Sequence, residues 1–335
     1  MDKEGNILPE SDFTVVGASF AGSLLASKLA KHGKVLLIDK REPGSRLKCG
    51  GGVRAKEFET LGLDIPHVKI DIITMAGSGK TAGFKSGYVV VDRRELDMAI
   101  LKKAVDSGVI FRKAEYLSHD PARNIFNIRI DGQIQEYAYK KLILAKGFDP
   151  AIQGKFYGSS YVEMVESRSR HEAELYFSLL QDTPGYCWIF PLPGGKVNVG
   201  IGSLSTRPFS KEVFRKFKEE QGITGRILCK GGGMIPLVPV STVMDGNVYL
   251  FGDSAGMVFS ANGEGLRNII KMSDIWADCI ANGKNLNTAW ITNRTFIRLL
   301  ISSIVVKLIA ASGGYDTNIY NFLSRMAALM RRMTQ

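Results

Sequence analysis

Two glycines and a serine, spaced as Gly17-x-Ser19-x-x-Gly22, form the first group of residues whose types point to chemistry. Gly17 permits a tight turn, and Gly22 permits close packing of a helix on a strand, so the backbone can approach a pair of phosphates. The next apolar run ends in an acid, Asp39, which would accept hydrogen bonds from ribose hydroxyls. These residues predict a dinucleotide site whose pyrophosphate faces the start of a helix.

A strand, a helix and a second strand must hold these residues in place. The apolar run from Phe13 ends at Gly17, a helical pattern follows, and Val35–Ile38 is the second apolar run. This order is that of the dinucleotide-binding βαβ unit. The motif does not separate FAD from NAD, but its place near the start of the chain favours FAD.

A long loop after Asp39 carries Cys49 and then three glycines, Gly50, Gly51 and Gly52. Consecutive glycines let the backbone lie against something flat or bulky, and a plain flexible turn is the alternative. Lys40 would lie near the adenosine phosphates. Farther along, Arg93 marks a strand–helix junction from which an arginine can reach a pyrophosphate.

A second glycine-rich turn follows the apolar strand Val248–Phe251. It begins with Asp253, passes Gly263 and Gly265, and leads into a helix predicted over Leu266–Ala281. In a flavoprotein the acid would bind a ribityl hydroxyl, and the positive end of the helix would face the flavin pyrimidine carbonyl.

An aromatic stripe occurs in the segment YCWIFP. Alternation in a strand sends Tyr186, Trp188 and Phe190 to one face. Such a stripe suits a protein core, and it equally suits the wall of an apolar substrate cavity.

The composition limits the class of protein. The chain has 335 residues, 45% hydrophobic and 23% charged, which predicts a globular protein of two interleaved domains. We expect a cytoplasmic protein, because no secretory signal opens the chain and no apolar run approaches the ~20 residues of a membrane span. The 4 cysteines show no zinc spacing, so no metal is predicted, and a disulfide between one pair stays open.

The net charge of +11 is concentrated toward the end of the chain. No nucleic-acid module is present, so we expect no nucleic-acid partner. The basic excess after Ile291 favours peripheral contact with an anionic membrane at the inner face of the cell membrane. A solvated basic helix face is the alternative.

The remaining pattern predicts an α/β fold, with a Rossmann-like domain on a parallel sheet, an inserted antiparallel-sheet domain and a C-terminal helical tail. A hairpin is predicted around Asp131-Gly132 and a short charged helix over residues 210–221. The predicted domains are a discontinuous FAD-binding domain (1–63, 88–150 and 245–285), an antiparallel-sheet substrate domain (64–87 and 151–244) and a basic helical region (286–335).

With these motifs in order, the chain resembles the geranylgeranyl reductase family of FAD-dependent, p-hydroxybenzoate hydroxylase-like flavoproteins. The matching segments are VVGASFAGS, DKREPGSRLKCGGGV, GYVVVDRRELD, YCWIFPLPGGKVNVGIG and GDSAGMVFSANGEGL. By this resemblance the FAD-binding residues would be Gly17, Ala21, Gly22, Asp39, Lys40, Cys49, Gly50, Gly52, Arg93, Ala114 at the adenine, Asp253, Gly265 and Leu266.

The resemblance implies an enzyme that saturates carbon–carbon double bonds of geranylgeranyl or polyprenyl chains in archaeal-type membrane lipids. Hydride would pass from reduced flavin N5 to one alkene carbon, and a proton would add to the other. Tyr186, Trp188 and Phe190 would bind the substrate, and Cys49, Tyr186 and Trp188 are the catalytic candidates. The electron donor, a ferredoxin-like protein or NAD(P)H, is left open.

Other functions fit the same resemblance, namely a menaquinone-tail reductase, a flavin monooxygenase or halogenase, and a non-catalytic electron-transfer flavoprotein. The chain also departs from the family pattern. Lys146-Gly147 stands where an aspartate is usual, which argues against direct NAD(P)H use and mildly against a monooxygenase. Ser260-Ala261-Asn262 lacks the usual proline, and the region after Gly265 is short, which would suit a smaller or different substrate.

Overall fold

The computed structural model describes residues 8–167, 170–180, 184–204 and 209–311. The predicted C-terminal region extends to residue 335, so its part from 312 onward lies outside the described residues, as do residues 1–7 of the first predicted domain.

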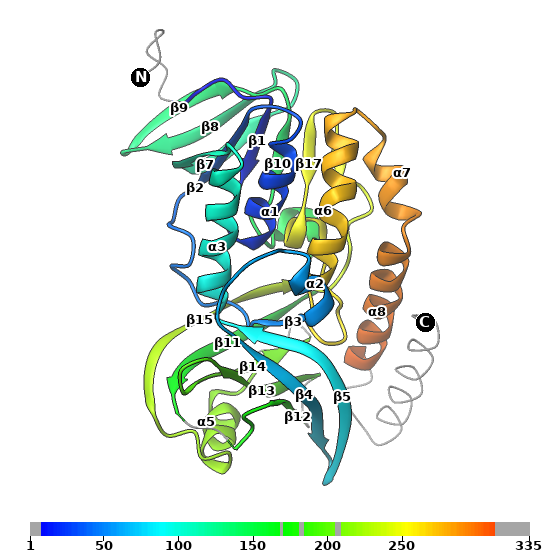
Figure 1. Ribbon diagram of the computed structural model, residues 1–335. Helices are drawn as coiled ribbons and strands as arrows, with labels where there is room; N and C mark the ends of the chain where they lie inside the picture. Colours follow the sequence, from blue (N-terminus) through cyan, green and yellow to red (C-terminus); the bar gives the residue numbers. More distant parts are fainter. Residues whose placement is uncertain (1–7, 168–169, 181–183, 205–208, 312–335) are drawn as a thin grey trace.

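A mostly parallel sheet forms one half of the molecule (Figure 1). Its described strands, in sheet order, are β16 (Met244–Asp245), β17 (Val248–Leu250), β10 (Leu142–Leu144), β1 (Phe13–Val16), β2 (Val35–Asp39) and β6 (Ile110–Lys113). β1 pairs in parallel with both β2 and β10, and only the edge strand β16 is antiparallel. The central strands are buried on both faces, which explains why they read as continuous apolar runs.

Helices cover one face of this sheet and a small sheet covers the other. The helices are α1 (Phe20–Leu29), α3 (Arg93–Asp106) and α6 (Leu266–Ala281), and the small sheet has β7 (Glu115–Asp120), β8 (Ile125–Ile130) and β9 (Gln133–Ala138). Alternation along β1 divides its side chains, since Val15 packs with the helices and Val16 packs with Phe126 and Ile128 of β8.

A larger, mainly antiparallel sheet forms the other half of the molecule. Its described strands, in sheet order, are β15 (Arg226–Pro236), β11 (Tyr157–Glu166), β14 (Lys196–Ser203), β13 (Gly185–Leu192), β12 (Glu174–Leu179), β4 (His67–Gly77), β5 (Lys80–Val91) and β3 (Gly52–Arg54). The single parallel pair is β12 with β4. β4 and β5 are long strands that pair along nearly their whole length.

The two faces of β13 have different neighbours. Cys187 and Ile189 pack on Phe214 and Phe217 of α5 (Lys211–Glu220), a charged helix whose first turn is capped by the Ser210 side chain. Tyr186, Trp188 and Phe190 point the other way, toward the parallel-sheet half.

Short elements complete the described chain: α2 (Ala55–Glu59), α4 (Pro150–Gln153), the 3-10 turn η1 (Gly252–Ala255), α7 (Leu286–Ile291) and α8 (Arg294–Ala311). α8 follows α7 and runs down the side of the molecule toward the antiparallel half (Figure 1). The predicted fold class is therefore confirmed. The division into three sequence regions stays a prediction, and β3, from the first of them, pairs within the antiparallel-rich sheet.

Candidate active site

A cavity of about 1360 Å³ lies between the two halves of the molecule and is lined by residues of both. Pockets that hold one small molecule usually measure about 300–1,000 Å³, so this cavity has room for a cofactor and a second ligand. The structure brings all the predicted site residues except Gly22 to the wall of this cavity.

Gly22 serves the packing instead. A Cβ on Gly22 would collide with the carbonyl oxygen of Gly17, and a Cβ on Gly17, whose φ is +105°, would collide with the carbonyl of Ala145. Each glycine is thus required by the close approach of α1 to β1 and β10. The predicted reason for these two residues agrees with the geometry.

The N-terminus of α1 has the features of an anion-binding site. Ser19, Phe20 and Ala21 line the cavity, the first turn contains no acidic residue, and the Ser19 side chain makes no capping hydrogen bond. Backbone N–H groups at a helix start attract phosphate. Asp39 stands nearby, where Oδ2 accepts a hydrogen bond from the Ala18 N–H at 2.8 Å and the carboxylate also faces the cavity. These residues fit the pyrophosphate and ribose of a dinucleotide.

Lys40 and Ala114 line the same end of the cavity. Lys40 Nζ is 3.0 Å from Glu115 Oε1, so its charge is already partly paired. Lys146, the residue that departs from the family pattern, pairs with Asp149 at 2.7 Å and lies over the ring of Tyr116. Its charge therefore stays at this end of the cavity and is balanced there.

Arg93 is held in the middle of the cavity by an acid that the sequence analysis did not identify. Arg93 Nη2 is 2.8 Å from Asp97 Oδ1, and the same carboxylate accepts the Phe20 N–H at 3.1 Å. Asp97 therefore ties α3 to the start of α1. Its spacing of four residues from Arg93 on one helix was the available signal. Burial by itself would lower the pKa of Arg93, but Asp97 and the hydrogen-bonded Cys49 raise it, so the guanidinium stays charged.

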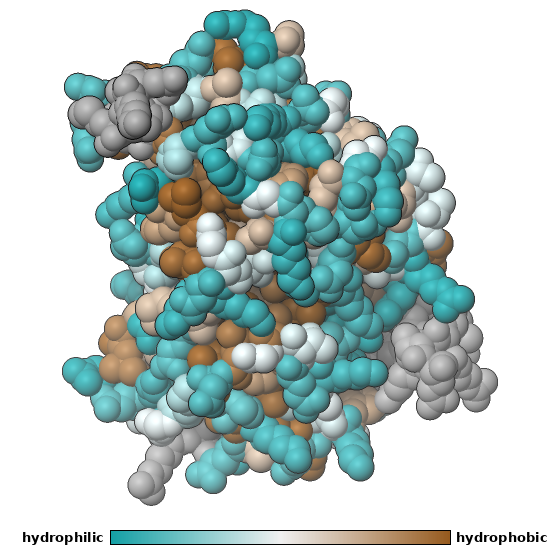
Figure 2. Space-filling view, turned by 45° about the horizontal axis from the view of Figure 1, so that its top comes forward, coloured by the Kyte–Doolittle hydropathy of each residue, from teal (hydrophilic) through white to brown (hydrophobic). Residues whose placement is uncertain are grey.

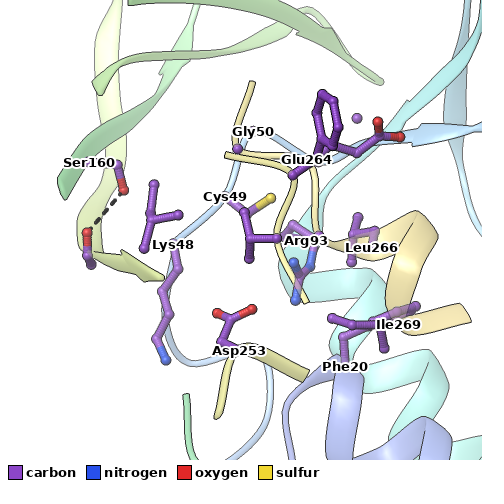
Figure 3. Close-up of a pocket in the computed structure, with 18 of the residues that line it drawn as sticks. Phe20, Lys48, Cys49, Gly50, Arg93, Ser160, Asp253, Glu264, Leu266 and Ile269 are labelled. Carbon is purple, nitrogen blue, oxygen red and sulfur yellow. Dashed lines mark hydrogen bonds between the residues drawn. The ribbon is translucent and has the colours of Figure 1, made fainter. Parts of the chain in front are cut away.

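Cys49, Lys48 and Asp253 face the same space as Arg93 (Figure 3). Burial raises the pKa of Asp253, although the positive charges of Lys48 and Arg93 oppose the shift. Burial and the neighbouring charge of Arg46 lower the pKa of Lys48. A carboxyl group that is costly to charge here is well suited to hydrogen-bond a hydroxyl group.

The glycines after Cys49 lie against an aromatic ring of the protein itself. A Cβ on Gly50 would be 2.5 Å from the Phe190 ring, and Gly52 is next to the same ring. Gly51, at φ +86°, approaches the Val91 carbonyl. The expected contact with something flat thus exists within the chain. Contact of these glycines with a flavin stays a prediction.

The aromatic stripe forms one wall of the cavity and continues onto the neighbouring strand. Phe177 of β12 lies opposite Trp188 in the strand register and contacts Tyr186 and Phe190 with ring centroids 5.2 and 5.3 Å apart. The sequence analysis missed Phe177 because its position depends on the pairing of β12 with β13. The Tyr186 hydroxyl donates to the carbonyl of Asn262, 2.6 Å away, in the loop before α6.

Two residues of β14, Gly200 and Asn198, fix the position of the Trp188 side chain. Gly200 lies opposite Trp188, and a Cβ there would enter the indole ring. The Trp188 Nε1–H donates to Asn198 Oδ1 at 2.8 Å, and Asn198 Nδ2 donates to the carbonyl of Cys49 at 3.0 Å. Asn198, which is 2% exposed, therefore connects the substrate-side sheet to the loop at the centre of the cavity.

Much of the remaining lining at this end is apolar, and α8 forms one side of it. Apolar side chains from β4, β5, β12 and α8 include Ile73, Met75, Phe84, Leu175, Leu179, Leu299, Ile301 and Val305, and three arginines, Arg54, Arg267 and Arg298, also line the cavity. The space-filling view shows hydrophobic residues recessed among polar ones on the visible face (Figure 2). One end of the cavity thus suits a dinucleotide, and the other suits a long apolar chain.

The described part of the chain contains no group of His, Cys, Asp and Glu side chains that could hold a metal. All four cysteines are free in the structure, so the disulfide left open by the sequence does not form there. No helix among the described residues is long and apolar enough to cross a membrane.

The parallel sheet, the start of α1 and the adjoining apolar chamber fit a dinucleotide-binding protein with room for a second, apolar ligand. No protein-family model matches the chain. Among curated relatives, it is 29% identical over 332 residues to menaquinone reductase from Mycobacterium tuberculosis, covering 84% of this chain and 78% of the relative. It is 27% identical over 298 residues to digeranylgeranylglycerophospholipid reductase 1 from Methanococcoides burtonii, covering 77% and 71%.

Among solved structures, a geranylgeranyl bacteriochlorophyll reductase-like protein from Thermoplasma acidophilum matches with a TM-score of 0.74 and 20% identity, covering 90% of this chain and 88% of that one. The flavin-dependent halogenase CmlS shares the fold, with a TM-score of 0.70, 15% identity, and coverage of 94% and 67%. The predicted resemblance to geranylgeranyl reductases is thereby confirmed. The comparisons support FAD as the cofactor and a reductase as the class of enzyme.

Proposed function

We propose that the protein is an FAD-dependent reductase that saturates carbon–carbon double bonds of polyprenyl chains. The observation that carries the proposal is the continuity of one cavity, from the dinucleotide cradle at α1 to the aromatic wall on β12 and β13. Bound FAD, once reduced, supplies the hydride. The protein supplies orientation, a dry environment and a proton.

The aromatic wall would stabilise the charge that develops on the alkene. An isolated trisubstituted alkene is not polarised, so addition of hydride and proton passes through positive charge on the more substituted carbon. The rings of Phe177, Trp188 and Phe190 can stabilise such a charge through their negative faces, with about 0.5–2 kcal/mol per favourable contact. The Trp188 N–H is already bonded to Asn198, so these three rings offer water no free polar group, and water would otherwise trap the cation.

Cys49 is our candidate for the proton donor. Its thiol faces the middle of the cavity, beside the charged Arg93 (Figure 3). After the thiol gives its proton to the alkene carbon, the remaining thiolate would be stabilised by the guanidinium group. Tyr186, whose hydroxyl is held by Asn262, would limit how the chain lies along the wall.

An anaerobic mass-spectrometric assay tests this function. Dithionite-reduced holoprotein is incubated with a geranylgeranyl lipid, and we expect the product to gain the mass of H₂ for each double bond reduced. The same protein without dithionite, and reduced free FAD without protein, serve as controls. If FAD is bound and reducible but no polyprenyl substrate gains mass, the protein is an electron-transfer flavoprotein and the proposal is wrong.

Reduction of a menaquinone tail is the second candidate. It is favoured by the 29% identity to the mycobacterial menaquinone reductase, which covers 84% of this chain. The chemistry is the same, and only the polar end of the substrate differs. Parallel assays with menaquinone and with a geranylgeranyl phospholipid, compared by kcat/KM, separate the two.

Peripheral contact with an anionic membrane would bring the cavity to its lipid. α8 exposes one apolar row, Ile297, Leu300, Ile304 and Leu308, spaced by three or four residues. The buried face of the same helix lines the cavity, and the exposed Lys307 flanks the row. An amphipathic helix of this kind can lie in the headgroup layer and gains from anionic lipid.

A vesicle sedimentation assay tests this contact. Ile304→Asp should lower binding to vesicles of phosphatidylglycerol and phosphatidylcholine, whereas Ile134→Asp, at a still more exposed residue of β9, should not. Equal binding of wild type and Ile304→Asp, or no preference for anionic over neutral vesicles, would contradict the proposal. The electron donor, a ferredoxin-like protein or NAD(P)H, is identified by supplying each in place of dithionite.

A further inference from the structure

Three arginines, far apart in sequence, line the cavity where α2, α6 and α8 approach one another. We call them the arginine cluster: Arg54, Arg267 and Arg298. Arg54 immediately precedes α2, Arg267 lies in the first turn of α6, and Arg298 lies in the first half of α8. α2 packs against α6, and Arg298 lies close enough to Arg54 and Arg267 for their positive charges to act on it. No function assigned above uses these residues.

Positive charge exceeds negative charge around the cluster. Arg267 Nε is 3.1 Å from Glu57 Oε1, but Lys271 Nζ shares the same oxygen at 3.3 Å. The other acid close by is Glu264, whose charge acts on Tyr88 and Arg298 and whose buried Oε1 has no hydrogen-bond partner among the described residues. The three arginines and Lys271 are thus opposed by the carboxylates of Glu57 and Glu264.

Two of the arginines have no carboxylate within ion-pair distance among the described residues. Arg54 instead lies over the Tyr88 ring, 4.5 Å from its centroid, and its buried Nε has no hydrogen-bond partner there. Burial and the positive charges of Arg267 and Arg54 lower the pKa of Arg298, although Glu264 opposes the shift. Guanidinium groups held together in this way would gain from an anion between them.

The cluster adjoins the apolar chamber. Leu299, Ile301 and Val305, which follow Arg298 on α8, line the chamber itself. Ser302, one turn after Arg298, accepts the Ala261 N–H at 3.0 Å and so anchors α8 to the loop before α6. A ligand in this part of the cavity would meet a cationic group at one end and hydrocarbon walls beyond it.

We infer that the arginine cluster binds a phosphate group carried by the polyprenyl substrate. The inference rests on the proposed reductase function and names its substrate class as a phosphate-bearing polyprenyl lipid. Planar guanidinium groups bind phosphate through two parallel hydrogen bonds, which fixes the orientation of the head while the chain remains free to slide. A neutral quinone head would leave these charges unpaired.

A binding experiment that needs no turnover tests the inference. Holoprotein with oxidised FAD is titrated with geranylgeranyl phosphate, with geranylgeraniol and with inorganic phosphate, and tryptophan fluorescence reports binding. Wild type should bind geranylgeranyl phosphate at least about tenfold more tightly than geranylgeraniol, because only the phosphate can accept charged hydrogen bonds from the arginines. Inorganic phosphate should bind much more weakly, because it lacks the chain.

Variants on α8 locate the site. Arg298→Gln should weaken the binding of geranylgeranyl phosphate about tenfold and leave the affinity for geranylgeraniol unchanged. Arg298→Lys should retain part of the difference in affinity between the two ligands. Arg294→Gln, which removes an exposed arginine outside the cavity on the same helix, should change neither affinity. Circular dichroism melting curves establish that the variants fold.

The outcomes separate this inference from the function on which it rests. Equal wild-type affinity for the phosphate and the alcohol, or an equal loss of both in Arg298→Gln, would overturn the phosphate site, even if polyprenyl reduction is observed. Displacement of geranylgeranyl phosphate by NADPH, with loss of NADPH binding in Arg298→Gln, would assign the cluster to a nucleotide and overturn it as well. Phosphate-dependent binding without any reduction supports the site and contradicts the reductase function.

Discussion

Replacement of Asn198 by leucine should destabilise the protein and separate the two halves of the site. Leucine keeps the branched shape of asparagine, with bulkier methyl groups, but removes both hydrogen bonds, one from Trp188 Nε1 at 2.8 Å and one to the Cys49 carbonyl at 3.0 Å. The Trp188 side chain is 6% exposed, so its N–H would be left without water or protein. The Cys49 carbonyl lies beside the cavity and can recover a water molecule.

The expected loss of stability in Asn198→Leu depends on the different surroundings of the Trp188 N–H and the Cys49 carbonyl. An orphaned buried donor costs about 1–3 kcal/mol, and a carbonyl that regains water costs less, so we expect a loss of about 2–3 kcal/mol in the free energy of unfolding. Urea unfolding followed by far-UV circular dichroism measures it. Asn127→Leu, which removes a hydrogen bond on the exposed face of β8, should change the free energy by less than about 0.5 kcal/mol.

A double-mutant cycle with Trp188→Phe makes the test specific. Phenylalanine removes the indole N–H, so Asn198→Leu should cost less in the Trp188→Phe background than in wild type, with a coupling of about 1 kcal/mol or more. Strict additivity, or a loss below about 0.5 kcal/mol for Asn198→Leu alone, would refute the argument that this hydrogen bond is a buried link.

Three further predictions concern other parts of the site. Burial raises the pKa of Cys187 from 9.0 to about 12, so between these pH values only the unfolded chain ionises this thiol. The free energy of unfolding should therefore fall by about 1.4 kcal/mol per pH unit in this range. Urea titrations at rising pH measure this slope, and Cys187→Ala should remove the contribution of the thiol to it. Gly50→Ala should displace the Phe190 ring and lower the melting temperature by several degrees. Gly83→Ala is the control, because its Cβ would meet only a methyl group at 3.8 Å, and its melting temperature should not fall. Equal melting temperatures for the two variants would contradict the packing argument. Asp39→Asn should weaken FAD binding about tenfold or more in a flavin-fluorescence titration of the apoprotein, and an unchanged Kd would show that the carboxylate is not at the ribose.

The sequence was most informative where structure is local. The βαβ unit and α6 were predicted closely, because glycine spacing, apolar periodicity and strand length all depend on neighbours in the chain. The alternation of β13 correctly placed its three aromatic side chains on one face. α3 begins at Arg93, the predicted strand–helix junction, because the Asp92 side chain accepts the Arg94 N–H and caps the helix there.

The sequence was least informative where contacts join distant segments. Phe177 and Asn198 reach the site through the register of β12, β13 and β14, which no single strand specifies. The arginine cluster joins residues separated by more than two hundred positions, and each arginine alone resembles a surface charge. Asp97 has a local signal, but its second contact, with the start of α1, depends on how two helices pack.

The side chain of Asn198 has a consequence for attempts to alter what the chamber accepts. Exchange of the β13–β14 hairpin for that of another flavoprotein would look like a change of substrate wall alone. The transplanted hairpin would also have to supply the amide that holds the Cys49 carbonyl, or the loop that follows Asp39 would lose its support. Wall and loop therefore have to be redesigned together, and a chimaera that neglects this link should lose flavin before it gains a new substrate.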